Sequence, residues 1–278
     1  MMGQKNLISS LEELIQTKTF PQFVIVTGQK GSGKKTLAKH IAKKVSDNVI
    51  MLDNLSVDSI RGMIEQCHKI KDLCYIIPDA DTMSAAAKNA MLKVTEEPPN
   101  NSTFIMTLED VQNTFDTIRS RASVFKMSPY AKDELLEYTK TYKLSEKQTD
   151  LLLSACDTPG DVDTVVANDV LEFFDYVTLV ADNIAEVSGA NAFKIPSKVA
   201  LKDTDEGYDL KMFWKLYIHY CMEFVATNKD TLENQIRLRW IGITCQYIQD
   251  LSIRGINRQM LMDNWILDIR KEAFNGAK

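Results

Sequence analysis

The feature that most constrains this chain is a glycine-rich loop between a short apolar segment and a helix-forming segment. Residues 23–27 (FVIVT) have the composition of a strand buried on both faces of a parallel sheet. Residues 28–34 (GQKGSGK) follow directly, and residues 34–45 carry apolar side chains at helical spacing. In this context glycines let backbone N–H groups approach phosphate oxygens, and the helix start adds a favourable dipole. The pattern predicts a P-loop, whose expected phosphate contacts are Gly28, Gly31, Ser32, Gly33 and Lys34.

Strands and helices alternate along the first part of the chain. Further strands are predicted at residues 49–52, 74–77, 103–107 and 123–127, and helices at residues 6–17, 57–68 and 82–95. This alternation predicts an α/β domain with a parallel sheet and helices on both faces.

After Pro129 the pattern becomes helical. Residues 131–185 are predicted as helices with a break at 158–160, residues 186–207 are polar and broken, and residues 208–277 are helical again. We therefore expect a P-loop domain at 1–128, a small helical lid domain at 129–185, a linker at 186–207 and a helical domain at 208–278.

The residues that would hold Mg²⁺ beside the loop are altered in two places. After its lysine the motif has Ser or Thr, but this chain has Lys35, and a protonated lysine has no lone pair for a metal. Thr36 comes next, yet one step along a helix turns a side chain by about 100°. The third strand ends in Pro78 and Asp79, where an ATPase of this class has Asp and Glu. Asp79 is either a weak substitute or, with Asp81, a turn residue that caps the next helix.

Two segments later in the first domain form a long block with a specific resemblance. Residues 75–83 (YIIPDADTM) and 90–99 (AMLKVTEEPP) resemble the AAA+ clamp-loader family, whose variant of the block ends Leu-Leu-Lys-x-x-Glu-Glu-Pro-Pro. Residues 57–65 resemble the helix before that block. Residues 153–162 and 256–270 are similar to the Ser-Pro-Gly turn and the last collar helix of delta-prime subunits of bacterial DNA polymerase III. The resemblance implies a delta-prime-like chain in a short form, without the four-cysteine zinc module, whose C-terminal helices form an oligomerisation collar.

The same resemblance assigns roles to single residues. Residues 117–122 (TIRSRA) resemble the Ser-Arg-Cys motif, which implies that Arg121 is an arginine finger for a neighbouring subunit's ATP site. A planar, permanently charged guanidinium suits the charge that develops on a transferred phosphoryl group. Thr107 occupies the family's sensor-one position, although a solvent-facing strand threonine is an equal alternative. Asp161, Val162 and Asp163 follow Gly160 directly, where motor-type subunits have their sensor-two arginine.

Charge and cysteine usage narrow the function classes further. The formal net charge of −5 at pH 7 gives no global positive field for nucleic acid, so DNA contact depends on a local patch or on partners. The five cysteines have no C-x-x-C spacing, which predicts free thiols and no zinc. No apolar run approaches the roughly 20 residues that span a bilayer. We expect a soluble, cytoplasmic protein with no membrane partner.

Together these patterns predict a stator-like clamp-loader subunit. It would join other clamp-loader subunits in a hetero-oligomeric ring, bind ATP with an incomplete Mg²⁺ site, hydrolyse little of it alone, and help to place the sliding clamp on primed DNA. An autonomous DNA-dependent P-loop ATPase, which uses Asp79 and Thr36 as replacement groups, is the alternative. A scaffold that kept the fold and lost the chemistry is a third interpretation.

Overall fold

The chain divides into two compact units in the computed structural model. One unit comprises Met1–Tyr138 with Thr158–Gly160, and the other comprises Thr139–Asp157 with Asp161–Lys278. The structure describes residues 3–187, 189–194, 197–201, 207–251, 253 and 255–276. Ser188 and Pro196 of the predicted linker therefore lie outside the described residues. The further division of the second unit into a lid and a collar stays a prediction.

Five strands form one parallel sheet in the first unit, in the order β2-β3-β4-β1-β5. They are β1 (Phe23–Thr27), β2 (Asn48–Met51), β3 (Leu73–Ile77), β4 (Thr103–Leu108) and β5 (Ser123–Lys126). Strand β1 lies between β4 and β5, so the loop that follows β1 lies at the carboxyl edge of the sheet with a strand on each side. This is the position at which parallel α/β sheets hold ligands.

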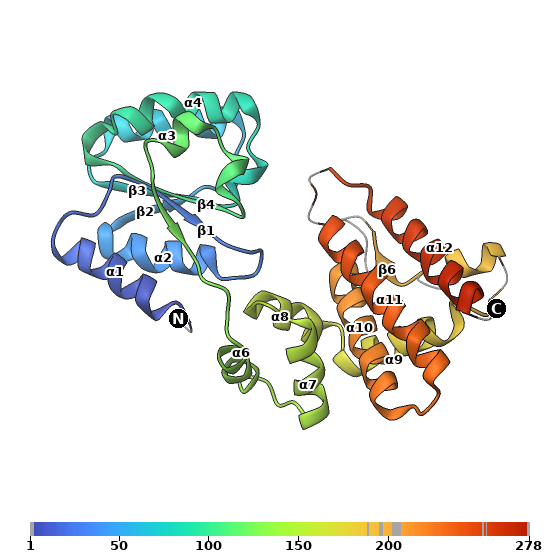
Figure 1. Ribbon diagram of the computed structural model, residues 1–278. Coiled ribbons are helices and arrows are strands. Elements are labelled where there is room, and N and C mark those ends of the chain that lie inside the picture. The colour runs from blue at the N-terminus through green and yellow to red at the C-terminus, as the bar shows by residue number, and fades with distance from the viewer. Residues whose placement is uncertain are drawn as a thin grey trace. The chain divides into compact units, whose positions relative to one another are not determined.

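Helices cover both faces of this sheet, as the sequence predicted (Figure 1). They are α1 (Lys5–Gln16), α2 (Lys34–Val45), α3 (Val57–Lys69), α4 (Ala85–Glu96) and the short α5 (Asp116–Arg119). Val24 and Val26 of β1 pack with α1 and α2, whereas Phe23 and Ile25 pack with the opposite layer of α3 and α4. All four are buried. The uninterrupted apolar sequence of β1 thus reflects a strand between two cores.

Some element boundaries differ from those predicted. The helix expected at 82–95 is a 3₁₀ turn, Ala80–Thr82, followed by α4, which Ser84 caps by accepting from the backbone N–H of Ala87. Pro159, expected to lie in a break, instead begins helix α8 (Pro159–Ala167). Proline fits the first turn of a helix because its missing N–H would have had no partner there.

The second unit is built mainly from helices. They are α7 (Glu146–Ala155), α9 (Val170–Asn183), α10 (Leu210–Thr227), α11 (Thr231–Asp250) and α12 (Arg258–Gly276). Helix α6 (Lys132–Thr139) comes between β5 and α7 in the sequence. The predicted linker region contains a 3₁₀ segment, Gly189–Lys194, and strand β6 (Val199–Ala200), which pairs with β7 (Tyr208–Asp209). Among the described helices none is both long and apolar enough to cross a membrane.

Aromatic side chains form the core of this helical unit. Trp265 and Trp214 are fully buried, and their ring centroids lie 6.1 Å apart. The indole N–H of Trp265 donates to the hydroxyl of Thr244, and that of Trp240 donates to the carbonyl of Ile269. Met262 and Trp265, one turn apart on α12, are both buried and therefore belong to this core.

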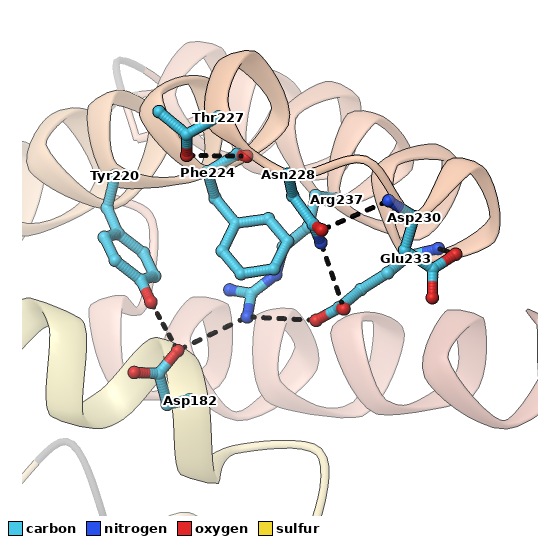
Figure 2. A network of polar contacts seen from close by, with 8 residues as sticks. All are labelled: Asp182, Tyr220, Phe224, Thr227, Asn228, Asp230, Glu233 and Arg237. Atoms are coloured by element: carbon cyan, nitrogen blue, oxygen red, sulfur yellow. Dashed lines mark hydrogen bonds and ion pairs between the residues drawn. The ribbon is translucent and has the colours of Figure 1, made fainter.

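A buried arginine lies beside this core (Figure 2). The Arg237 side chain is only 6% exposed and lies over the rings of Phe224 at 4.4 Å and Trp240 at 4.9 Å. It also pairs with Asp182 at 3.3 Å and approaches Glu233 at 3.9 Å. Arg237 thereby joins α9, α10 and α11.

Candidate functional site

The glycine-rich loop connects β1 to α2 with the backbone conformation that its glycines allow. Gly31 and Gly33 have φ values of 78° and 87°, in the left-handed region that most other residues avoid. Gly33 is the N-cap of α2, and Ser32 is buried within the turn. The segment thus has the strand–loop–helix context that phosphate binding requires.

Lys34 is a buried lysine whose ammonium contacts the loop itself. Its Nζ donates to the carbonyls of Gly28 at 2.7 Å and Gln29 at 2.9 Å. Burial lowers the pKa of Lys34, and the nearby carboxylates of Glu109 and Asp79 act in the opposite direction. Phosphate oxygens are stronger acceptors for an ammonium than neutral carbonyls. The present contacts therefore hold the charge in a place where an anion can replace them.

Lys35 contacts the carboxylate that would be available to a metal. Its Nζ lies 2.5 Å from Oδ2 of Asp79, and both side chains are about half exposed, at 51% and 50%. Thr36 is exposed one position further along α2, and Pro78 offers no side-chain ligand. Mg²⁺ requires several oxygen ligands in octahedral geometry. Lys35 and Pro78 supply no side-chain oxygen for such a shell, and among the described residues no cluster of three His, Cys, Asp or Glu could hold a metal.

The carboxylates of Asp79 and Asp81 do not cap helix α4. Asp79 has φ 47° and makes no side-chain cap hydrogen bond to the 3₁₀ turn that follows it. Asp81 accepts from the backbone N–H of Glu109 at 2.7 Å, and Ser84 caps α4. Asp79 thus lies in the expected turn, but the expected side-chain cap on the next helix is wrong, and the Asp79 carboxylate is paired with Lys35 instead.

Thr107 links β4 to the turn after β3. The pairing of Ile77 with Met106 brings Thr107 beside this turn, and its hydroxyl accepts from the backbone N–H of Asp79 at 3.0 Å. Thr107 is 0% exposed, so the alternative of a solvent-facing strand threonine is wrong. Its hydroxyl positions the backbone of Asp79, while a sensor-one role stays a prediction.

Arg121 lies just after α5 and is held by two acceptors. Its Nη1 donates to the carbonyl of Thr117 at 2.7 Å, and its Nη2 pairs with Oε1 of Glu96 at 2.6 Å. The Arg121 side chain is 35% exposed to solvent. These partners belong to α5 and α4 rather than to the glycine-rich loop, so the guanidinium has a preferred direction that does not depend on Lys34 or Lys35.

Sequence reasoning missed three contacts around the predicted site. Glu96, the partner of Arg121, lies within the Glu-Glu-Pro-Pro block and was not assigned a role. The Gly160 N–H donates to the carbonyl of Gly31 at 3.0 Å, and a Cβ on Gly160 would lie 2.5 Å from Gly31 Cα. Tyr130 donates its hydroxyl to the carbonyl of Ser32 at 2.8 Å. The Thr158-Pro159-Gly160 sequence signals a turn, but nothing in it indicates which loop the turn contacts.

Comparison with known proteins relates this site to a family. The family described as "DNA polymerase III, delta subunit" matches residues 52–131, which include Asp79, Thr107 and Arg121. The DNA polymerase III subunit gamma of Buchnera aphidicola subsp. Schizaphis graminum is 25% identical over 171 residues, which are 50% of this chain and 47% of that protein. The replication factor C small subunit of Methanosphaera stadtmanae is 25% identical over 232 residues, 76% of this chain and 72% of that protein. The chain is therefore similar in sequence to DNA polymerase III gamma subunits and to replication factor C small subunits.

The first of these matches spans about half the length of the Buchnera protein. Solved structures agree on the fold. A gamma subunit-related protein of Thermotoga maritima is 15% identical with a TM-score of 0.50, over 95% of this chain and 99% of that one. The RuvB Holliday junction branch migration motor of the same organism is 15% identical with a TM-score of 0.52, over 76% and 87% of the two chains. The predicted AAA+ fold with following helices is therefore confirmed.

Proposed function

We propose that this chain is a delta-prime-like, stator-type clamp-loader subunit that acts in the cytoplasm. It joins other clamp-loader subunits in a hetero-oligomeric ring, helps to load the sliding clamp on primed DNA, and donates Arg121 to the ATP site of a neighbouring subunit. Homology to DNA polymerase III gamma and replication factor C small subunits supports the clamp-loader part of this proposal.

The observation that carries the arginine role is the way Arg121 is held. Two acceptors, Glu96 and the carbonyl of Thr117, orient the guanidinium, yet 35% of the side chain remains exposed. A donor for another subunit needs both properties, because a guanidinium that is already oriented loses less conformational entropy when it meets a phosphate. The Lys35–Asp79 pair, which occupies the chain's own metal position, supports the stator assignment.

Exposed apolar side chains support the collar part of the proposal. On α11 and α12, Leu238 is 54% exposed, Met260 62% and Leu267 52%. Large apolar side chains on neighbouring helices are a common feature of subunit interfaces. On this basis we propose residues 208–278 as the collar, and the proposal keeps residues 129–185 as the lid.

Reconstitution with motor-type clamp-loader subunits, clamp and primed DNA tests the arginine role. Arg121→Ala should lower the ATPase rate of the assembled complex by about 10³-fold, the size found for arginine fingers. Arg119→Ala is the matched control, because Arg119 lies on the same short helix and pairs with Asp116 at 2.8 Å. The control complex should keep its rate. If both complexes hydrolyse ATP like the wild type, Arg121 is not a finger.

Assay of the isolated chain tests the alternative of an autonomous DNA-dependent ATPase. The stator proposal expects turnover near background with and without primed DNA. Robust turnover that Lys34→Ala abolishes would establish the alternative instead.

A further inference from the structure

The described part of the chain places a lysine at the position where a P-loop protein seats its metal. Lys35 is an exposed residue in the first turn of α2, and its ammonium lies 2.5 Å from the Asp79 carboxylate. The two residues come from different elements, the first turn of α2 and the turn after β3. The buried hydroxyl of Thr107 binds the backbone of Asp79 and so fixes the carboxylate end of this pair.

This ion pair competes with a magnesium ion for the same place. Mg²⁺ takes oxygen ligands at about 2.0–2.1 Å in an octahedral shell and gives up its waters reluctantly. The ammonium already occupies the Asp79 oxygen, carries no lone pair, and repels a divalent cation. A metal could enter only if Lys35 moved away and left its charge beside the metal.

The loop nevertheless keeps the features that bind a phosphate chain. Gly31 and Gly33 have left-handed backbones, and Lys34 has two neutral carbonyl acceptors that phosphate oxygens can replace. A lysine ammonium has three N–H donors. Lys35 can therefore donate to Asp79 and to a phosphate oxygen at once, as a bridging metal would connect a carboxylate and a phosphate.

We infer that Lys35 substitutes for Mg²⁺, so that the loop binds a nucleoside di- or triphosphate without a metal ion and retains it rather than hydrolysing it. This inference rests on the proposed function for the identity of the site and extends it to the form of the ligand. The nucleotide is then a structural ligand of the loop, and its affinity is set by two lysines instead of one lysine and a metal.

Calorimetric titration of the full chain with ATP and with ADP tests this directly. In EDTA the wild type should bind, and millimolar Mg²⁺ should leave the affinity within about threefold or weaken it, because metal-free binding has no metal ligand to gain. Lys35→Ser removes the ammonium and restores the motif hydroxyl. In that variant binding should weaken by about tenfold in EDTA and strengthen by at least about tenfold with Mg²⁺.

Two further variants complete the test. Lys39→Ala, an exposed lysine one turn along the same helix, should bind as the wild type does under both conditions. Lys35→Ala should lose affinity in EDTA without gaining a response to Mg²⁺ comparable to that of Lys35→Ser. Binding by the wild type that Mg²⁺ strengthens by more than about threefold, or no binding at millimolar nucleotide in EDTA, would overturn the inference.

The experiments distinguish failure of the metal substitution by Lys35 from failure of the proposed clamp-loader function. If binding requires Mg²⁺ but Arg121→Ala still silences the reconstituted complex, only the metal substitution is wrong. If binding is metal-free but Arg121→Ala changes nothing in the complex, the loop behaves as inferred and the arginine role is wrong.

Discussion

Two buried cations, Lys34 in the glycine-rich loop and Arg237 in the helical unit, show how differently a charge can be accommodated. Both residues are nearly inaccessible, at 6% and 5% exposure. Lys34 contacts two neutral carbonyls of its own loop, whereas Arg237 lies over three aromatic rings and pairs with Asp182. The first arrangement leaves a charge that can bind an anionic ligand, whereas the second pairs the charge with a carboxylate and aromatic rings of the fold.

This difference matters because burial alone does not distinguish a functional charge from a structural one. The contacts of Arg237 come from α9, α10 and α11, so they form only when these helices pack. The contacts of Lys34 are local and add little long-range stability. Replacing each residue should therefore affect different properties, stability for Arg237 and ligand binding for Lys34.

Arg237→Ala should produce the largest stability loss, about 3 kcal/mol. It removes three cation–π contacts and the ion pair with Asp182, and leaves a cavity among the rings. All three tryptophans of the chain lie in the second unit, so tryptophan fluorescence in urea reports on the unfolding of that unit. Arg239→Ala, on the same helix with an exposed pair to Glu272, should cost less than about 0.5 kcal/mol. Equal losses would remove the distinction.

Lys34→Met should have the opposite profile. Nucleotide affinity should fall by about 100-fold, because a charge-assisted contact to phosphate is lost. Burial lowers the pKa of Lys34, which means that the charged form is disfavoured in the folded state relative to the unfolded state. The unliganded protein should therefore change little in stability, because relief of the desolvated ammonium offsets the loss of its hydrogen bonds to the carbonyls of Gly28 and Gln29. Circular dichroism during urea unfolding measures this, and the wild-type cost should shrink as pH rises toward the lysine range. A marked loss of stability would mean that Lys34 is structural too.

Glu96→Gln tests a third cation, Arg121, whose charge is paired within the fold but remains partly exposed. The variant keeps the shape of the side chain but loses the charge that orients the guanidinium. The ATPase rate of the reconstituted complex should fall by about three- to tenfold, while complex assembly and unfolding free energy stay unchanged. Glu97→Gln, at the next position, is the matched control. A rate equal to that of the control would show that Glu96 does not position Arg121.

The two buried cations also differ in how far sequence could predict them. The glycines, the apolar strand before them and the helix after them are local signals, and they predicted the loop position of Lys34 and a parallel-sheet strand at β1, but not the neighbours of that strand. Arg237 has no such signal, since it stands two residues from Arg239 in a helix with a weak apolar stripe. Its environment depends on α9 and α10, distant in sequence. The approach of Gly160 to Gly31 was missed for the same reason.

A cation of intermediate burial, Lys215, gives the smallest expected effect. Its Nζ lies 2.5 Å from Oδ2 of Asp157, and its side chain is 15% exposed, whereas the Asp157 side chain is 44% exposed. Burial acts to raise the pKa of Asp157, but the hydrogen bonds and charges of Lys215 and Lys211 outweigh it and lower that pKa. A lowered folded-state pKa stabilises the fold above the unfolded-state value, near 4, and this contribution is lost as pH falls through the folded-state value.

Asp157→Asn should therefore cost less than about 1 kcal/mol at pH 7, because the half-exposed carboxylate is screened by solvent. The difference between wild type and variant, followed by tryptophan fluorescence in urea from pH 7 to pH 3, should shrink toward zero as the wild-type carboxylate becomes protonated. Asp150→Asn, an exposed aspartate on α7, is the control for loss of one negative charge. A difference that stays constant across this pH range would mean that Asp157 contributes through hydrogen bonds to its neighbours and not through its charge. Lys215 would then resemble Lys34, whose ammonium is held by hydrogen bonds to neutral carbonyls and not by an ion pair.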